Sequence, residues 1–271
     1  MMLRVFVFFW AFTFFVSVLG ERKEVFAQDD LPQAHRIVTL SPHLAEIVYA
    51  AGAGNYVVGV MAGTNYPAAA AKHPIVGGFN GVDFEALINL EPTMVLAWEQ
   101  GNKLADIFKL KRLGIPVHIL SAASFNDLEK QIIDVSQLFG TEKIGDELIV
   151  SINNRILNLG QQGKKNRHRK VFIKIWDKPI FIIGHDHYIN EALKVCGVSN
   201  VGENYPFAAG SVSIETMLLS GADAILDLTV NDLIEDAEPS SLRHFHRFLS
   251  LRIIEADSEL LMRLSPRFVD G

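Results

Sequence analysis

Cysteine is almost missing from this 271-residue chain: Cys196 is the only one, so no disulfide can form within the chain. Its thiol is interpreted as a small, buried apolar side chain. Positive charge is also scarce, because 25 lysines and arginines face 31 aspartates and glutamates, which gives a formal net charge of −6. A nucleic-acid partner would favour a basic surface, so we expect none. The one basic run, at residues 164–170, is interpreted as a solvated linker.

Several motifs that are typical of enzymes are absent as well. The sequence contains no G-x-S-x-G elbow, no glycine-rich phosphate loop and no dinucleotide-binding fingerprint. Two acids near the start of the second half, Asp177 and Asp186, do not define a hydrolytic site on their own. These absences favour a protein that is not an enzyme.

Nine histidines raise the question of a metal site. The densest group is His185-Asp186-His187, and His244 and His246 form a second. Histidines two positions apart in a loop can reach one ion, but no helix-spaced pair and no Cys/His framework accompanies them. We expect no resident metal. An exported metal-dependent hydrolase that uses the first group remains the alternative from a different class.

Long apolar runs are confined to the N-terminus. Arg4 precedes an apolar stretch that extends from Val5 to Gly20, and Val25-Phe-Ala27 offers a small-residue cleavage site. We expect a signal peptide at residues 1–27 that sends a soluble protein to the periplasm. Cleavage after Gly20 and an uncleaved anchor are the alternatives. No cysteine lies near the end of the apolar run, so we do not expect a lipoprotein.

The remaining chain alternates short apolar strands with helical patterns, which predicts an α/β fold with mostly parallel central sheets. Apolar residues recur at helical spacing from about residue 125 to residue 159. They indicate one long helix or two, since Gly140 and Gly145 weaken the middle. We expect two α/β lobes bridged by a long helix, with a ligand cleft between the lobes. The expected boundaries are an N-terminal lobe at 28–124, a bridging helix at 125–162 and a C-terminal lobe at 163–271.

Two stretches, Val82-Asp-Phe-Glu-Ala-Leu and Val212-Ser-Ile-Glu-Thr-Met, are versions of one another. In each, a helix-cap residue stands two positions before a glutamate and a buried-strand pattern follows: Asp83 precedes Glu85, and Ser213 precedes Glu215. A repeated unit is typical of two similar lobes. Helix capping is the simplest interpretation of each copy. Capping does not explain why an acid occupies the same offset in both.

Aromatic side chains gather near the expected loops and strand ends: Tyr66, Phe79, Trp98, Trp176, Phe181 and Phe207. Rings around a cleft suit a flat, largely apolar ligand that is held by stacking and area burial. We expect Trp176 to be a core residue instead. His43 follows the first expected strand and so lies on the edge where ligands of α/β sheets bind.

Further motifs extend along the whole chain after the signal segment: Arg36-Ile-Val-Thr-Leu-Ser-Pro-x-x-x-Glu46, Asn65-Tyr-Pro67, Val76-Gly-Gly-Phe-x-Gly-x-Asp-Phe-Glu85, Glu91-Pro-Thr-Met-Val-Leu-Ala-Trp98, Leu113-Gly-Ile-Pro-Val117, Cys196-Gly and Ser265-Pro-Arg267. Together they resemble the cobalamin-binding periplasmic proteins of ABC importers. These proteins are part of a wider class that binds cobalamin, siderophores and haem.

The resemblance implies a monomeric carrier without a cofactor that captures a corrinoid, either cobalamin or cobinamide. It implies delivery to a membrane permease, whose paired arginines meet Glu85 from one lobe and Glu215 from the other. The ligand-binding residues that it implies are Tyr66, Phe79, Trp98, Phe181, Phe207, Glu259, Arg263 and His43.

The chain departs from the resembled pattern in places. Phe79 stands where tryptophan is typical, and no tryptophan occurs near Ala208. Glu259 stands where aspartate is expected, and Cys196 has no partner. A haem or an iron–siderophore therefore remains the alternative ligand within the same class.

Overall fold

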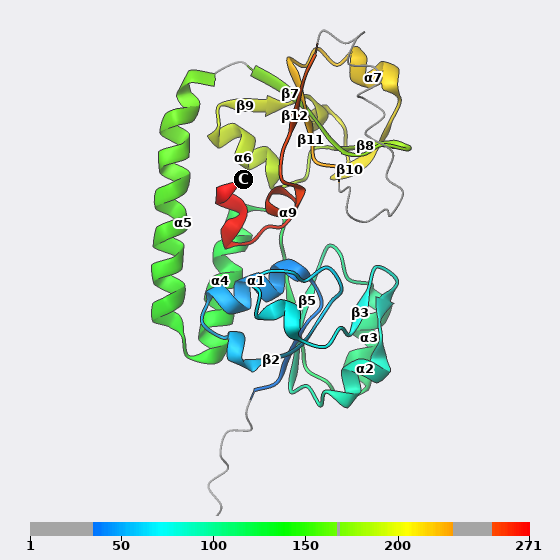
Figure 1. The fold of residues 1–271 in the computed structure, drawn as a ribbon, viewed down its shortest axis with the longest axis vertical. Helices are drawn as coiled ribbons and strands as arrows, with labels where there is room; N and C mark the ends of the chain where they lie inside the picture. The colour runs from blue at the N-terminus through cyan, green and yellow to red at the C-terminus, as the bar shows by residue number, and fades with distance from the viewer. Residues whose placement is uncertain (1–34, 167–168, 230–250) are drawn as a thin grey trace, which may run out of the picture. The chain divides into compact units, whose positions relative to one another are not determined.

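The computed structural model describes residues 35–166, 169–229 and 251–271 of the chain. The predicted signal peptide, residues 1–27, lies outside the described residues, as do His244 and His246. The described residues form two α/β lobes, each built on its own sheet (Figure 1). The two-lobed α/β fold predicted from the sequence is therefore confirmed. No helix within these ranges is long and apolar enough to cross a membrane.

The first lobe contains a four-stranded parallel sheet in the order β2-β1-β5-β6. Its strands are β1 (Ile37–Thr39), β2 (Val57–Val60), β5 (Met94–Trp98) and β6 (Val117–Leu120). The helices are α1 (Pro42–Ala50), α2 (Phe84–Asn89) and α3 (Leu104–Arg112), and a small hairpin is formed by β3 (Gly77–Gly78) and β4 (Gly81–Val82).

Alternate side chains of these strands enter two different cores, as the pleat of a strand requires. Ile37 and Leu96 pack with buried residues of α1. Val38 and Val95 pack with Leu87 of α2 and other buried residues of the opposite layer. Helices therefore cover both faces of the parallel sheet, and its carboxyl edge carries the loops that can meet a ligand.

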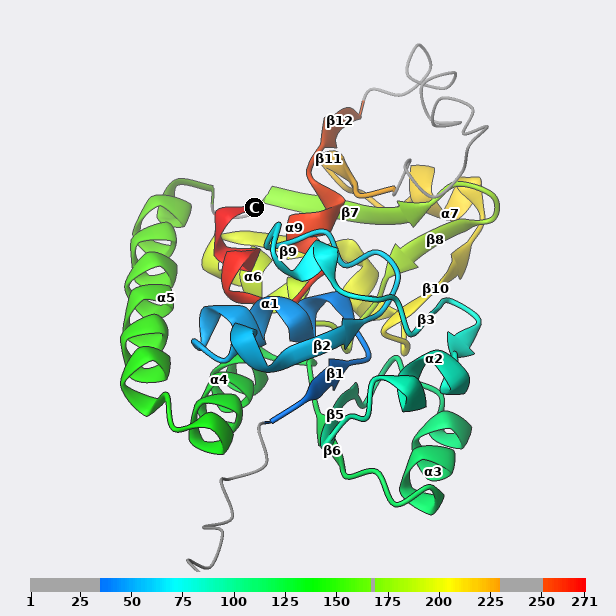
Figure 2. The same ribbon diagram turned by 60° about the horizontal axis from the view of Figure 1, so that its bottom comes forward.

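The helical connector consists of two helices, α4 (Phe125–Phe139) and α5 (Glu142–Gly163), which lie side by side (Figures 1 and 2). A capping box between Ser124 and Asp127 starts α4. Gly140 ends it in the left-handed conformation, with φ of 65°, which glycine adopts without steric cost. The sequence left open whether this connector is one helix or two, and the structure shows two. The longer one has 22 residues and extends about 33 Å.

The second lobe contains a mixed sheet in the order β10-β8-β7-β11-β12, with β9 also pairing with β7. Its strands are β7 (Arg169–Trp176), β8 (Ile180–Ile183), β9 (Val198–Asn200), β10 (Ala209–Val212), β11 (Ala224–Asp227) and β12 (Arg252–Glu255). Strands β9, β11 and β12 extend the sheet in parallel, whereas β8 pairs antiparallel with both of its neighbours, β7 and β10. The prediction of mostly parallel sheets holds fully only for the first lobe.

Helices of the second lobe are short: α6 (Ile189–Val195), α7 (Ile214–Leu218) and α9 (Ser258–Leu261). The last described element is a 3-10 helix, η6 (Pro266–Asp270), whose first residue is a proline. Phe268 of η6 belongs to a buried cluster that also contains Leu44 of α1 and Ile173 of β7. The two lobes and the C-terminal segment therefore share one continuous core.

Candidate functional site

Residues that follow the strands of the first sheet come together at its carboxyl edge. His43 lies in the first turn of α1 after β1, and Trp98 is the last residue of β5. Their rings stand edge to face with centroids 5.2 Å apart. Tyr66 belongs to the loop after β2 and is 44% exposed, so its ring is accessible to a ligand.

His43 is buried and electrically neutral. Burial first, and the positive charge of Arg263 second, lower the pKa of His43 to about 3. The hydroxyl of Ser41 lies 2.6 Å from Nδ1. Nε2 of His43 and Nε1 of Trp98 are both buried, and neither has a hydrogen-bond partner among the described residues. Because buried polar atoms are normally paired, these two nitrogens are suited to hydrogen-bond a ligand.

Trp98 is held in place from its backbone and from the loop beneath it. Its amide donates to Oδ1 of Asn102 at 2.6 Å, and Nδ2 of Asn102 donates to the carbonyl of Leu40 at 2.8 Å. Gly101 approaches the indole so closely that a Cβ there would overlap the ring. The strand ends of β1 and β5 are thus tied together, and the loop fixes the orientation of the indole.

A charged cluster joins the first lobe to the last residues of the chain. We call it the Glu46 cluster, and its members are Glu46, Asn65, Glu259, Arg263, Ser265 and Arg267. Nδ2 of Asn65 donates to both carboxylate oxygens of Glu259, at 2.6 and 2.8 Å. Nη1 of Arg263 donates to Oδ1 of Asn65 at 2.7 Å. The predicted ligand residues Glu259 and Arg263 therefore contact the loop that carries Tyr66.

The other three predicted aromatic residues lie apart from this cluster. Phe79 is at the tip of the β3–β4 hairpin and is completely exposed. Phe181 is half-buried and pairs with Trp176 at the carboxyl end of β7. Phe207 packs into the core of the second lobe, and the strand that follows it begins opposite Ile183, at the other end of β8 from Phe181. The structure thus brings together Tyr66, Glu259 and Arg263, and separately His43 and Trp98.

The histidine group of the second lobe lines a cavity of about 260 Å³ together with Asn190 and Glu191. His185 Nδ1 lies 2.5 Å from Oδ1 of Asp186, and His187 Nδ1 accepts a hydrogen bond from the amide of Ile189. Burial lowers the pKa of His187 to about 4. In the part of the chain that the structure describes, no three His, Cys, Asp or Glu side chains are placed to hold a metal ion.

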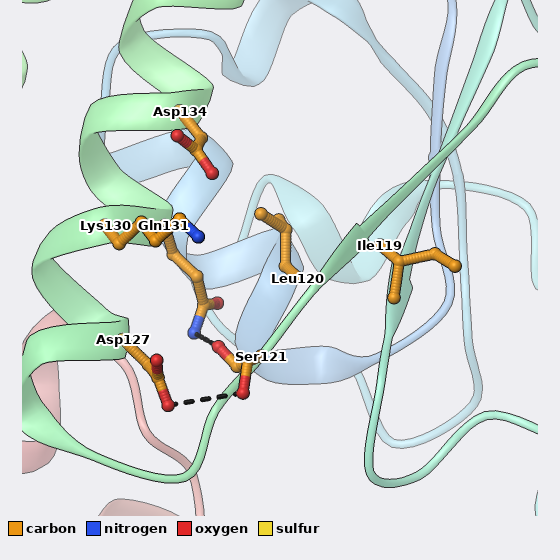
Figure 3. A pocket seen from close by; sticks show the side chains of 7 residues that line it. All are labelled: Ile119, Leu120, Ser121, Asp127, Lys130, Gln131 and Asp134. Atoms are coloured by element: carbon orange, nitrogen blue, oxygen red, sulfur yellow. Dashed lines mark hydrogen bonds between the residues drawn. The ribbon is translucent and has the colours of Figure 1, made fainter.

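A smaller pocket of about 30 Å³ lies where β6 leads into α4 (Figure 3). The Ser121 hydroxyl donates to Asp127, and Nε2 of Gln131 donates to the carbonyl of Ser121. The pocket is too small for an organic ligand. These contacts instead fix the junction between the first lobe and the helical connector.

The repeated glutamates are on exposed first turns of equivalent helices, Glu85 on α2 and Glu215 on α7. The caps predicted for both helices are confirmed: Asp83 accepts from the amide of Ala86, and Ser213 from that of Thr216. Each helix leads to a strand in the middle of its sheet, β5 or β11. A hydrogen bond from Ser213 lowers the pKa of Glu215.

Glu46, Ser265 and Arg267 occur in the sequence motifs, but the sequence alone did not predict a role for them. The signal for Glu46 was present, because this acid stands between Ala45 and Ile47 in a helix whose neighbouring residues are apolar. A carboxylate in such a position needs cationic partners once it is buried. Nothing in the sequence identifies these partners, which lie more than 200 residues away.

The chain belongs to the periplasmic binding protein family, whose model matches residues 37–232. Members of this family are substrate-binding proteins of the periplasm. Among curated relatives, the vitamin B12-binding protein of Vibrio parahaemolyticus is 28% identical over 68% of this chain and 66% of its own length. That of Vibrio cholerae is 27% identical over 71% of this chain and 70% of its own length. The chain thus spans about two thirds of these relatives.

Solved structures share the fold. The crystal structure of the periplasmic vitamin B12-binding protein BtuF of Vibrio cholerae matches with a TM-score of 0.77 and 25% identity, over 88% of this chain and 93% of that one. The apo form of the periplasmic heme-binding protein RhuT from Roseiflexus matches with a TM-score of 0.73 and 21% identity, over 88% and 94%. At 21% identity, the similarity to RhuT shows a shared fold and nothing more.

Proposed function

We propose that this chain is a periplasmic substrate-binding protein that captures a corrinoid, cobalamin or cobinamide, and delivers it to an ABC permease. The similarity to vitamin B12-binding proteins supports this ligand. Tyr66, Trp98, Glu259, Arg263 and His43 would form the centre of the binding surface. The other proposed ligand-binding residues are Phe79 in the first lobe and Phe181 and Phe207 in the second.

The observation that carries the proposal is the charge balance of the Glu46 cluster. Its two carboxylates, Glu46 and Glu259, face two guanidinium groups, Arg263 and Arg267, so the formal charges of the cluster cancel. Arg263 already contacts both acids. Corrinoids present neutral amide side chains, which pair well with such mixed donors and acceptors. Haem presents carboxylates, which would require cations that are not already compensated.

In this proposal the protein is a monomeric carrier and not an enzyme, and it holds no cofactor or resident metal. Residues 1–27 would be a signal peptide, without a lipid anchor, that directs the chain to the periplasm. The lobe boundaries given by the sequence, 28–124, 125–162 and 163–271, are kept as part of the proposal. The exposed acids Glu85 and Glu215 would dock on paired arginines of the permease, since such pairs add geometric specificity and faster association more than raw affinity.

Equilibrium titration of tryptophan fluorescence with cyanocobalamin, cobinamide and haemin tests the ligand. We expect both corrinoids to bind with Kd below about 10 μM, and haemin to bind far more weakly. Tyr66→Ala should weaken corrinoid binding, because it removes an exposed ring from the proposed surface. Phe108→Ala is the matched control, since Phe108 is an exposed aromatic residue on α3, outside the proposed surface. A Soret shift with haemin and no corrinoid binding would favour the haem alternative.

A further inference from the structure

Glu46 has an unusual environment for a carboxylate. It lies in α1 between apolar residues and is only 3% exposed. A buried carboxylate is costly unless it is paired and hydrogen-bonded. Among the described residues, the side chains that bond to it come from the last nine positions, in the segment that follows α9.

Both oxygens of Glu46 are fully engaged. Oε2 accepts from the Ser265 hydroxyl at 2.6 Å and from Nε of Arg267 at 3.0 Å. Oε1 accepts from Nη2 of Arg267 at 2.8 Å and from Nη1 of Arg263 at 3.2 Å. Arg267 therefore binds in the two-point geometry that makes arginine–carboxylate pairs strong. The hydrogen bonds that Arg267 donates to Glu46 are the main reason that the pKa of Arg267 is raised.

The same guanidinium groups reach residues of the proposed ligand surface. Arg267 lies over the ring of Tyr66, with its central carbon 3.7 Å from the ring centroid. Arg263 also donates to the carbonyl of Gly63 at 3.0 Å. Two short paths thus connect Glu46 to the binding surface, one through Arg267 to Tyr66 and one through Arg263.

The segment that carries these arginines is anchored on both sides of the cluster. Leu264 and Phe268 are buried in the continuous core, where Phe268 meets the rings of Phe125 and Tyr188. The hydroxyl of Tyr188 donates to the carbonyl of Leu261 at 3.2 Å. Asp270 forms an ion pair with Arg155 of α5. The backbone of the segment is therefore fixed on both sides of the cluster, and the Glu46 contacts set the positions of the two arginine side chains.

We infer that Glu46 is a positioning residue for ligand binding: it holds Arg267 against Tyr66 and Arg263 across the lobes, and so fixes the binding surface before a ligand arrives. This inference rests on the proposed function. Preorganisation of this kind increases affinity because less order has to be created on binding. Loss of the Glu46 charge would release Arg267 from its carboxylate partner and would leave Arg263 held only by Asn65, Gly63 and Glu259. The hold on the Tyr66 loop would therefore weaken.

The test compares four forms of the full chain: wild type, Glu46→Gln, Arg267→Lys and Asp227→Asn. Arg267→Lys keeps a positive charge but loses the two-point geometry and the contact of the guanidinium with the Tyr66 ring. Asp227→Asn is the matched control, because Asp227 is buried and paired with Lys174 at 2.9 Å in the second lobe, away from the cluster. It weakens the protein in a similar way without touching the proposed positioning.

Two quantities are measured for each form. The first is the Kd for cyanocobalamin. The second is the width of the distance distribution between nitroxide labels on the unliganded protein, placed at Lys111 in the first lobe and Ser199 in the second, with Cys196 replaced by serine. Both label sites are exposed. A purely structural role for Glu46 would lower stability in Glu46→Gln and Asp227→Asn alike, without changing either quantity selectively.

We expect Glu46→Gln to raise Kd by at least about tenfold and Arg267→Lys to raise it by a smaller factor, with Asp227→Asn within about twofold of wild type. The distance distribution should broaden in the first two variants only. Unchanged affinity and width in Arg267→Lys and in any folded Glu46→Gln would overturn the inference. If the wild type binds no corrinoid, the proposed function fails, and the distance distributions alone then decide the role of Glu46.

Discussion

Arg267 lies over the ring of Tyr66, with its central carbon 3.7 Å from the ring centroid, while it donates two hydrogen bonds to Glu46. A ring that is 44% exposed is thereby held by a cation whose own position is set by a buried acid. The cation–π contact and the two-point ion pair use the same guanidinium group, so together they restrict the position of the ring. The proposed ligand surface is thus supported from the core.

Phe79 should contribute to binding but not to folding. Its side chain is completely exposed at the tip of a hairpin, so it buries no area in the described structure. We expect Phe79→Ala to change the free energy of unfolding by less than about 0.5 kcal/mol, as is usual at the surface. The same variant should weaken corrinoid binding measured by fluorescence titration. Equal affinity for variant and wild type would remove Phe79 from the binding set.

Gly101→Ala should disturb Trp98 specifically. The added methyl group would overlap the indole ring, so the ring or the loop must move. We expect a shift of the tryptophan emission spectrum and weaker corrinoid binding. Gly160→Ala is the control, because the nearest side-chain atom to its new Cβ is Cγ1 of Val195 at 3.8 Å, and alanine favours a helix by up to about 1 kcal/mol. An unchanged spectrum in Gly101→Ala would contradict the packing described for Trp98.

Acid should destabilise the protein partly through His43. Its pKa in the folded protein, about 3, lies below the ordinary value of 6.5 that applies when the chain is unfolded. As pH falls, the unfolded chain therefore takes up the proton first, so stability is complete above pH 6.5 and is lost as pH falls from 6.5 towards 3. At pH 5 this loss is about 2 kcal/mol relative to pH 7.5.

Urea unfolding of wild type and His43→Gln at both pH values measures that loss. The variant has no imidazole at this position. Between pH 7.5 and pH 5, its free energy of unfolding should therefore fall by about 2 kcal/mol less than that of the wild type. His187 shares the direction, since burial lowers its pKa to about 4, and it contributes equally to both proteins. A difference that stays constant with pH would show that His43 is not held neutral by burial.

The repeated glutamates should serve transport and not ligand capture. Both are exposed on short capped helices, one in each lobe. We expect Glu85→Ala combined with Glu215→Ala to leave the Kd for cyanocobalamin within about twofold and to reduce uptake by at least about tenfold, because arginine–carboxylate docking is lost. Uptake by cells that express the double variant is the measurement. Normal uptake would refute the docking role.

The sequence predicted the elements whose patterns are local. The caps at Asp83 and Ser213 start α2 and α7, and Gly140, expected to weaken the helical connector, ends α4. Antiparallel pairing of β8 and β10 was not predicted, because strand direction depends on contacts between segments and not on the pattern within each strand. The Glu46 cluster was missed for the same reason. Its members are functional together only after the chain end returns to α1.

The central claim is that this protein binds a corrinoid at the surface formed by Tyr66, Trp98 and the Glu46 cluster. Titration of the purified protein with cyanocobalamin, in parallel with haemin, tests it most directly. One binding site with Kd below about 10 μM for cyanocobalamin, with much weaker binding of haemin, is the predicted result. Tight haemin binding without any response to cyanocobalamin or cobinamide would contradict the claim.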